Sequence, residues 1–173
     1  YTGMLETLKM AFVATIFGFI GAITLSSFAA KNLVPNYVLV PTRLFMSMTR
    51  SLPSIIWAII FVIVVGIGPL AGVLAMVIYT IGYLGKLQYE EIEGINREPL
   101  EAARAMGLNH SEIVSKVVLP ESGNTFLSQL LFMFEYNVRH GTVLGLVGAG
   151  GIGLHIDRAM ELNLYNHVRT YLI

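Results

Sequence analysis

Long apolar runs separated by short polar segments dominate the sequence. Residues 10–28 carry no charge, and a helix of that length, rising about 1.5 Å per residue, can cross a hydrocarbon core of about 30 Å. A second apolar run covers 52–68 and a third covers 69–85. The turn sequence Gly66-Ile67-Gly68-Pro69 between them predicts an antiparallel helical hairpin. We therefore expect membrane spans at about 8–29, 52–68 and 69–85.

The first run carries a stripe of small residues on one helical face. Small side chains let helices approach closely in lipid, where apolar side chains alone give little association. We expect this face to pack against other helices; it comprises Ala11, Thr15, Gly18, Ala22, Ser26 and Ala29.

Two further runs are less regular. One covers 122–138, and the start of another lies at 167–173. The segment 36–50 either extends the second helix or lies along the membrane interface as an amphipathic helix. The run at 122–138 has a polar stripe with helical spacing, which should face something other than lipid because unpaired charge is costly at membrane depth. This stripe consists of Asn124, Ser128, Glu135 and Arg139.

The composition favours a membrane protein over a soluble domain. Of 173 residues, 55% are hydrophobic and 13% are charged, about half the charged share of soluble domains. The net charge of zero gives no basic field for nucleic acid. The sequence has no cysteine, and its four histidines show no metal-ligand spacing. We therefore assign no catalytic residue, metal or cofactor.

The two ends of the sequence suggest a piece of a longer chain. It begins at Tyr1 without a methionine, shows no signal-peptide pattern, and stops as an apolar run opens. We expect a fragment that lacks terminal spans.

Lysine and arginine orient the chain in the membrane. Cytoplasmic segments are enriched in these residues. If the charged segment after the third run is cytoplasmic, its side carries seven of the eleven. We therefore expect the start of the chain outside, the charged segment inside and the later glycine-rich segment outside. The seven are Lys31, Arg43, Arg50, Lys86, Arg97, Arg104 and Lys116, against Lys9, Arg139, Arg158 and Arg169.

The charged segment between the third and fourth runs is too polar to enter lipid, yet its pattern is helical. Pro99 fits a first helical turn, and Glu101 adds negative charge near that helix's start. Gly107 permits a left-handed stop. Asn109 with Glu112 matches a capping box, with Asn in place of Ser or Thr. The pattern predicts a short helical hairpin that docks on something.

This predicted hairpin, over 98–119, has an apolar face on each helix. DNA binding is excluded as its role because its charge is mixed and membrane spans flank it on both sides. The apolar residues are Ala102, Ala103 and Met106 on the first helix, and Ile113, Val114, Val117 and Val118 on the second.

Glu101-Ala102-Ala103, followed at fixed spacing by further identities, matches the signature E-A-A-x3-G-x5-I-x5-L-P. The sequence thereby resembles the permease subunits of bacterial binding-protein-dependent ABC importers. The resemblance implies an all-α, polytopic fold of the type I importer permease (MetI-like) kind, as a single domain over 1–173 in the bacterial inner membrane. In that family the hairpin is the coupling helix, which inserts into a groove on the ATPase subunit. The residues that carry this role by resemblance are Glu101, Ala102, Ala103, Gly107, Ile113, Leu119 and Pro120.

The same resemblance implies partners. They are a separate ABC ATPase subunit, a periplasmic phosphonate-binding protein, a second permease copy in a homodimer, and membrane lipid. The chain itself has no GxxxxGK[ST] motif for ATP phosphates, because Gly85-Lys86 is followed by Leu87. It is therefore expected to be a transport subunit and not an enzyme.

A glycine-rich segment near the end also fits the dinucleotide pattern GxGxxG. That pattern needs a preceding strand and a following helix in a βαβ unit. Val143–Val147 is strand-like, but two membrane spans leave no room for such a unit. An NAD-binding membrane oxidoreductase and a passive channel stay as alternatives from other classes. The glycines are instead assigned to close packing at an outer gate: Gly148, Gly150, Gly151 and Gly153.

The region from Glu135 to Gly153 resembles the phosphonate-importer branch, as does Arg50-Ser51-Leu52-Pro53. The resemblance predicts transport of phosphonate or phosphite-like oxyanions. The methionine-importer branch shares the glycine-rich segment, so methionine or another small solute is the alternative. Glu135 and Arg139 either pair on one helix or Arg139 helps an anion enter the pathway, since guanidinium matches phosphonate oxygens. The residues expected along the substrate pathway are Asn124, Ser128, Glu135, Asn137 and Arg139.

Overall fold

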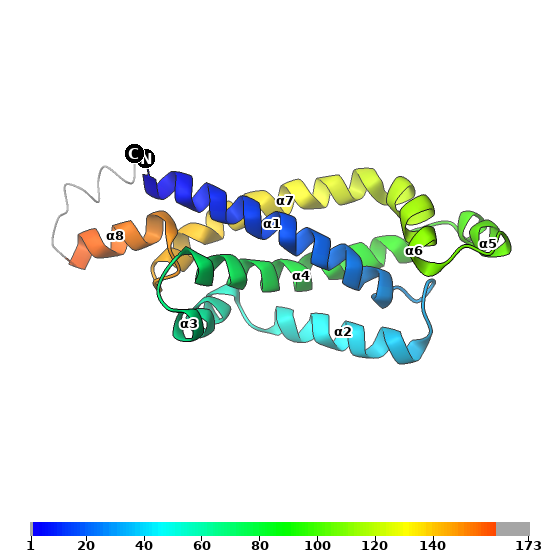
Figure 1. Cartoon of the computed structure of the whole chain (residues 1–173), viewed down its shortest axis with the longest axis horizontal. Coiled ribbons are helices and arrows are strands. Elements are labelled where there is room, and N and C mark those ends of the chain that lie inside the picture. Colours follow the sequence, from blue (N-terminus) through cyan, green and yellow to red (C-terminus); the bar gives the residue numbers. More distant parts are fainter. Residues whose placement is uncertain (1, 162–173) are drawn as a thin grey trace.

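The computed structural model describes residues 2–161 (Figure 1), and the regular secondary structure of these residues is entirely helical, which confirms the predicted all-α class. The predicted start of a further span at 167–173 lies outside the described residues. The elements in order are α1 (Thr2–Ala29), α2 (Asn36–Ser51), α3 (Ser54–Val65), α4 (Pro69–Gly94), α5 (Arg97–Ala105), α6 (His110–Ile113), the π-helical turn η1 (Val114–Val118), α7 (Leu119–Gly145) and α8 (Gly151–Glu161).

Three long helices, α1, α4 and α7, run along the long axis of the molecule (Figure 1). α1 packs against both α4 and α7, and α2 packs against α4. The start of α1 and helix α8 lie at one end, and α5 and α6 lie at the other (Figure 1). We name these the outer end and the cytoplasmic end, following the orientation that the lysine and arginine distribution predicts.

The small residues of α1 explain how closely these helices pack. A Cβ atom on Gly18 would lie 2.5 Å from Cγ2 of Thr80 on α4, so the two backbones approach where only glycine fits. The predicted packing face of the first run is therefore confirmed. All six of its members are buried: Ala11, Thr15, Gly18, Ala22, Ser26 and Ala29.

By length and composition, two of the described helices can each cross a membrane: α1 from Gly3, and α4. A third span results if α2 and α3 count as one bent element. α7, with 27 residues, is long enough but is too polar to qualify on composition. The predicted span at 122–138 thus lies in a helix whose polar positions need cover other than lipid.

The second apolar run does not form the straight span expected at 52–68. α3 has only 12 residues, about 18 Å of helix. α2 ends before it, and the two helices are bent by 89° relative to each other. Leu52 is extended at φ −98° and ψ 132° because Pro53 follows it and disfavours a helical residue at that position. Since α2 and α4 share the long axis (Figure 1), α3 lies across α4, which corrects the predicted antiparallel hairpin.

Two other boundaries also differ from the predicted spans. α4 begins at Pro69 as expected but runs on to Gly94 instead of ending near 85. The second helix of the hairpin does not stop at Leu119-Pro120 but continues through η1 into α7. Pro120 lies directly after the π-helical turn η1, where the regular hydrogen-bond pattern of the α-helix is already interrupted.

Candidate functional site

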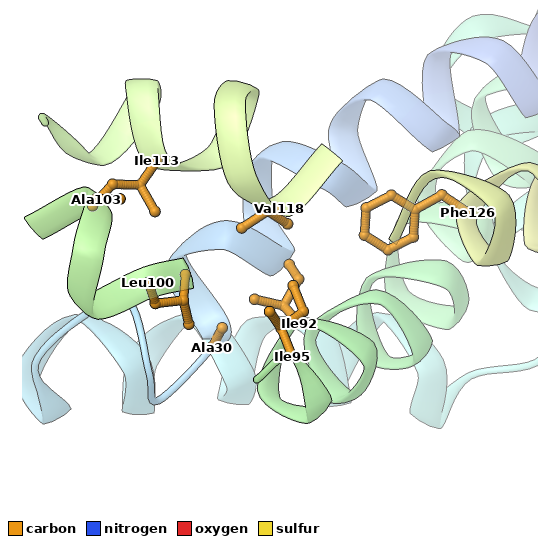
Figure 2. Packing of buried hydrophobic residues seen from close by; sticks show 8 residues of the cluster. All are labelled: Ala30, Ile92, Ile95, Leu100, Ala103, Ile113, Val118 and Phe126. Atoms are coloured by element: carbon orange, nitrogen blue, oxygen red, sulfur yellow. The ribbon is translucent and has the colours of Figure 1, made fainter. Parts of the chain in front are cut away.

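The cytoplasmic hairpin is held on the bundle by a compact apolar cluster (Figure 2). Leu100 and Ala103 of α5 point into it, with 3% and 1% of their surface exposed. Ile113 enters from α6 and is 6% exposed. Burying a side chain the size of Leu100 or Ile113 contributes about 1.5–3 kcal/mol. The remaining members come from α4, η1, α7 and the residues directly after α1 and α4: Ala30, Ile92, Ile95, Val118 and Phe126.

The turn between α5 and α6 has the local chemistry that the sequence predicts. Gly107 has a left-handed φ of +75°, and the Leu108 amide donates to the Ala103 carbonyl at 3.2 Å. The Asn109 amide donates to Oε2 of Glu112 at 2.8 Å within the predicted capping box. This backbone bond, followed by attraction to a nearby lysine, lowers the pKa of the Glu112 carboxyl.

The tip of the hairpin points its remaining side chains into solvent. Glu101, Ala102 and Gly107 are exposed, and Met106 is 70% exposed. The residues of the E-A-A signature therefore fall into two groups. Ala103, like Ile113, is buried and anchors the hairpin, while Glu101 and Ala102 are exposed to solvent. The expected apolar packing of Ala102 and Met106 is not found, since both lie on the exposed side.

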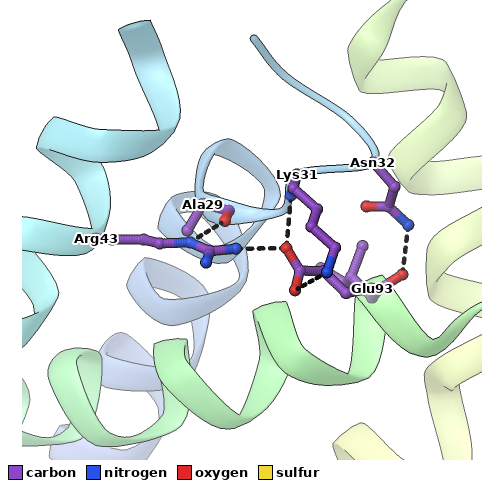
Figure 3. A network of polar contacts seen from close by, with 6 residues as sticks. Ala29, Lys31, Asn32, Arg43 and Glu93 are labelled. Atoms are coloured by element: carbon purple, nitrogen blue, oxygen red, sulfur yellow. Dashed lines mark hydrogen bonds and ion pairs between the residues drawn. The ribbon is translucent and has the colours of Figure 1, made fainter. Parts of the chain in front are cut away.

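A charged network, not predicted from the sequence, fixes the base of the hairpin (Figure 3). Glu93 near the end of α4 pairs with Arg43 of α2 and with Lys31, whose ammonium lies 3.6 Å from its carboxylate. Arg43 also donates to the Ala29 carbonyl at 2.8 Å. Asn32 donates to the Ile92 carbonyl at 2.7 Å, and Arg104 donates to the Asn32 carbonyl. Along the chain Glu93 lies 62 residues from Lys31 and 50 residues from Arg43, separations that no sequence pattern reveals.

The hairpin also contacts the end of α1 through His110. Its ring stacks on Phe28 with centroids 5.0 Å apart, and Nε2 lies 3.4 Å from the Ser27 hydroxyl. Partial burial lowers the pKa of His110 from its ordinary value of 6.5. The docked hairpin thus favours the neutral imidazole.

The predicted pathway residues do not share one surface. Asn124, Ser128, Glu135 and Arg139 are exposed on α7. Arg139 and Glu135 form an ion pair at 2.5 Å with exposed side chains, so the pairing considered from the sequence is confirmed. Asn137 lies elsewhere, because it is buried inside the bundle.

Asn137 instead ties three helices together. Its amide donates to the hydroxyl of Thr15 on α1 at 2.9 Å and to that of Thr80 on α4 at 3.1 Å. All three residues are at most 2% exposed. A bond of this kind within the membrane stabilises helix association by about 0.6 kcal/mol on average. The position of Asn137 is therefore structural in this conformation.

Next to the ion pair, α4 and α7 form an aromatic stack that the sequence analysis did not single out. Tyr136 stacks on Tyr79 with centroids 5.5 Å apart and donates to its hydroxyl oxygen at 3.0 Å. Tyr83 and His140 extend the stack. The spacing of Tyr79 and Tyr83, one helical turn apart, is the signal that would have indicated it.

At the outer end, the glycine-rich segment makes the turn from α7 to α8. Gly148, Gly150 and Gly151 have φ values of +83°, +81° and +73°, a region that favours glycine. The Gly68 amide, in the turn from α3 to α4, donates to the Gly148 carbonyl at 2.9 Å. The turn is thus tied to a neighbouring turn.

Two of these glycines also permit very close backbone packing. A Cβ atom on Gly150 would lie 2.6 Å from Cα of Pro69. One on Gly153 would lie 2.1 Å from the Thr142 carbonyl oxygen. Close packing was the role expected of this segment; whether it forms a gate stays a prediction.

The first turn of α8 receives its contacts from α1. The Ile152 amide donates to the Thr7 hydroxyl at 2.9 Å, and the Gly151 amide donates to the Glu6 carboxylate at 3.3 Å. Among residues 2–161 no strand precedes this turn, and Val143 lies in α7. The strand-like reading of 143–147 is therefore wrong, and the described residues form no βαβ unit for a dinucleotide.

Comparisons with known proteins agree with this geometry. Residues 22–167 match the family described as "binding-protein-dependent transport system inner membrane component". The chain is 35% identical over 171 residues to the phosphite transport system permease protein PtxC of Stutzerimonas stutzeri, covering 98% of this chain and 62% of that protein. It is 37% identical over 154 residues to the phosphate-import permease protein PhnE of Mycolicibacterium smegmatis, covering 88% and 29%.

Among solved structures, an inward-facing form of the MetNI methionine ABC transporter has a chain that matches with a TM-score of 0.83 and 26% identity. The match covers 99% of this chain and 85% of that one. The predicted MetI-like fold is confirmed.

The chain spans about three fifths of the length of the phosphite-system relatives that it matches. Its family match covers most of its residues, and the family's description places it in the inner membrane, as the sequence analysis expected. The chain belongs to the family of inner membrane components of binding-protein-dependent transport systems.

Proposed function

We propose that this chain is part of the membrane-spanning subunit of an ATP-driven importer, and that a separate ATPase subunit docks on the cytoplasmic hairpin. The observation that carries the proposal is the division within the hairpin. Leu100, Ala103 and Ile113 fix it to α1, α4 and α7, while Glu101 and Met106 are left free at its tip. A rigidly anchored hairpin with a free apolar tip can transmit movement from a partner to the bundle.

The transported solute is proposed to be a phosphite- or phosphonate-type oxyanion. Support comes from relatives named as phosphite, phosphate-import and phosphonate permeases, at 35–44% identity. A relative named as a D-methionine permease is 29% identical over 163 residues. Methionine is therefore the second candidate solute.

The proposed mechanism is alternating access in a homodimer that receives solute from a periplasmic binding protein. Glu135 and Arg139 are 67% and 74% exposed on α7, and charge this exposed at membrane depth requires a polar neighbour or water. A second copy and an aqueous route between the copies supply that environment. Arg139 would exchange its carboxylate partner for an incoming oxyanion, which guanidinium binds bidentately.

The test is uptake by the complete transporter, with its ATPase and binding protein, reconstituted in liposomes. We expect uptake of phosphite or phosphonate that requires ATP, with no uptake of methionine. Uptake without ATP would indicate a passive channel, and preferential methionine uptake would reassign the solute.

Arg139 is tested separately in the same assay. Arg139→Gln is expected to reduce oxyanion uptake strongly, with Lys9→Gln, which removes another exposed cation outside the predicted pathway, as the control. Normal uptake by Arg139→Gln, with equal amounts of protein in the membrane, would remove Arg139 from the pathway.

A further inference from the structure

A small basic cavity of about 180 Å³ lies between α2 and α4, away from the hairpin tip and from Arg139. Half of its six lining residues are cationic and none is acidic. They are Arg43, Met46, Ser47 and Arg50 from α2, and Lys86 and Tyr89 from α4.

The three cations differ in how far they are already neutralised. Arg43 is engaged by Glu93 and lies over the Tyr89 ring, 4.3 Å from its centroid. Lys86 approaches Glu90 at 3.4 Å, with both side chains about half exposed. Arg50 is exposed, and within residues 2–161 its side chain makes no hydrogen bond or ion pair. Arg50 therefore carries the charge that lacks a counter-ion.

The cavity lies at the membrane boundary on the cytoplasmic side. Lys86 is the first charged residue of α4 after the uncharged stretch from Pro69, so it marks the edge of the hydrocarbon region. A Cβ atom on Gly82 would lie 3.0 Å from Cγ of Arg50, which places the base of that side chain one helical turn deeper. Arg50 reaches the boundary by extending its long side chain towards Lys86, the behaviour known as snorkelling.

A stripe of apolar side chains runs along α2 directly beside the basic cavity. At 100° per residue, Val40 and Leu44 follow Ser47 around the helix, and Met48 follows them. These three side chains are 58%, 58% and 62% exposed. The surface next to the cavity is thus suited to an acyl chain, and the cavity itself is suited to a phosphate.

We propose that this cavity binds the phosphate group of an anionic phospholipid from the cytoplasmic leaflet. The Arg50 guanidinium and the Lys86 ammonium contact the phosphate oxygens, the Ser47 hydroxyl donates to one of them, and an acyl chain lies along the stripe of Val40, Leu44 and Met48. Basic cavities between helices on the cytoplasmic side are suited to anionic headgroups. A soluble oxyanion shares the phosphate chemistry but makes no use of the apolar stripe. The proposal does not depend on which solute is transported.

A lipid bound at this site would stabilise the contact between α2 and α4. α2 is separated from α3 by the break at Leu52-Pro53, so its position depends on its packing against α4 and α1 and on Arg43. A bound phosphate bridging Arg50 and Lys86 would add a second link between the two helices. Phospholipid charge in the inner leaflet would then affect how firmly α2 is held.

The experiment measures lipid binding to the full-length permease in its assembled complex, purified in detergent and stripped of lipid. Native mass spectrometry counts bound phosphatidylglycerol and, separately, phosphatidylcholine of the same chain length. We expect tighter binding of phosphatidylglycerol. Arg50→Gln and Lys86→Gln should each weaken it about fivefold, and the double variant about 25-fold, from the effect of a basic residue near an anionic membrane.

Two controls and one competition make the result decisive. Lys9→Gln removes an exposed lysine at the outer end and should leave binding unchanged. Arg50→Lys keeps the charge and should keep most of the affinity; it also serves if the double variant does not assemble. Inorganic phosphate should not displace the lipid.

Three outcomes would overturn the proposal. The first is equal binding of the two lipids, and the second is wild-type affinity in an assembled Arg50→Gln variant. The third is displacement of phosphatidylglycerol by inorganic phosphate, which would identify a site for a soluble oxyanion. Oxyanion uptake by the complete transporter is a separate measurement, so the lipid site and the proposed function can fail independently.

Discussion

The outer and cytoplasmic ends of the molecule are held to the helix bundle in different ways. At the outer end, the turn into α8 lies against Pro69 and α1 with backbones so close that a single Cβ atom would collide. At the cytoplasmic end, α5 and α6 extend beyond the bundle (Figure 1) and are held by side chains packed in one apolar cluster. One end is fixed by close backbone packing and the other by the packing of side chains.

This difference in packing between the two ends indicates where movement can enter the helix bundle. Close backbone packing leaves little room for another arrangement, whereas contacts made by side chains can repack at moderate cost. The π-helical turn η1, which joins α6 to α7, lies at the cytoplasmic end as well, and such turns interrupt the regular helix and often occur at functional positions. We therefore expect movement to enter the bundle at the cytoplasmic end and the outer end to stay fixed.

The largest expected effect is at the outer turn. Gly150→Val forces a β-branched residue into φ +81° and against Pro69, and the two effects together should cost about 3 kcal/mol or more. Thermal unfolding of the purified protein measures the loss.

Its matched control is Gly94→Ala at the end of α4. A Cβ atom there has no neighbour within 4 Å, so the change should stay within about 0.5 kcal/mol. If Gly150→Val were as stable as Gly94→Ala, the outer end would not be the rigid one.

The next effect is at the hairpin anchor. Leu100→Ala removes a side chain that is 3% exposed and should cost about 2–3 kcal/mol. Because the contact is local, hydrogen exchange in α5 should accelerate while α1 and α4 stay protected.

Met106→Ala at the exposed tip separates anchoring from docking. Its side chain is 70% exposed, so stability should change by less than about 0.5 kcal/mol, while coupling to the ATPase is reduced. Equal hydrogen exchange in Leu100→Ala and Met106→Ala would contradict the division of the hairpin.

A smaller loss of stability is expected from a substitution at Asn137, midway between the two ends. Asn137→Ala removes the bonds to Thr15 and Thr80, which should cost about 1–2 kcal/mol in total with the space left behind. Thermal unfolding in detergent is the measurement, and Asn124→Ala, exposed on the same helix, should be neutral. A neutral Asn137→Ala would show that the three-helix tie does not stabilise the bundle.

The smallest effect is the pH dependence of the hairpin. His110 has a lowered pKa when docked, so the undocked state binds protons more readily, and docking is strongest above pH 6.5 and weakens as pH falls. Glu112 also has a lowered pKa and loses its contribution only below its ordinary value of 4.5. We therefore expect the change in hairpin docking between about pH 7.5 and 5.5 to come from His110.

Limited proteolysis of the hairpin at the two pH values measures this effect. Cleavage should be faster at the lower pH in the wild type, and His110→Gln should remove the difference. A pH dependence that survives in His110→Gln would assign it to another group.

The sequence by itself determined the features that follow from local rules. Helical spacing placed the small residues of α1 on one buried face, Gly107 and Asn109 placed the hairpin turn, and the E-A-A signature indicated the family. Each depends on residues within a few positions of one another, where backbone geometry and capping decide the conformation.

Only the tertiary structure decided which residues face which neighbours. Ala103 and Ala102 are adjacent in sequence, yet one is buried and the other exposed because α4 and η1 lie on one side of α5. Glu93 finds Arg43 across 50 residues, and Asn137 is enclosed by α1 and α4 instead of lining the exposed face of α7. Such contacts depend on how helices pack, and no spacing along the chain encodes that.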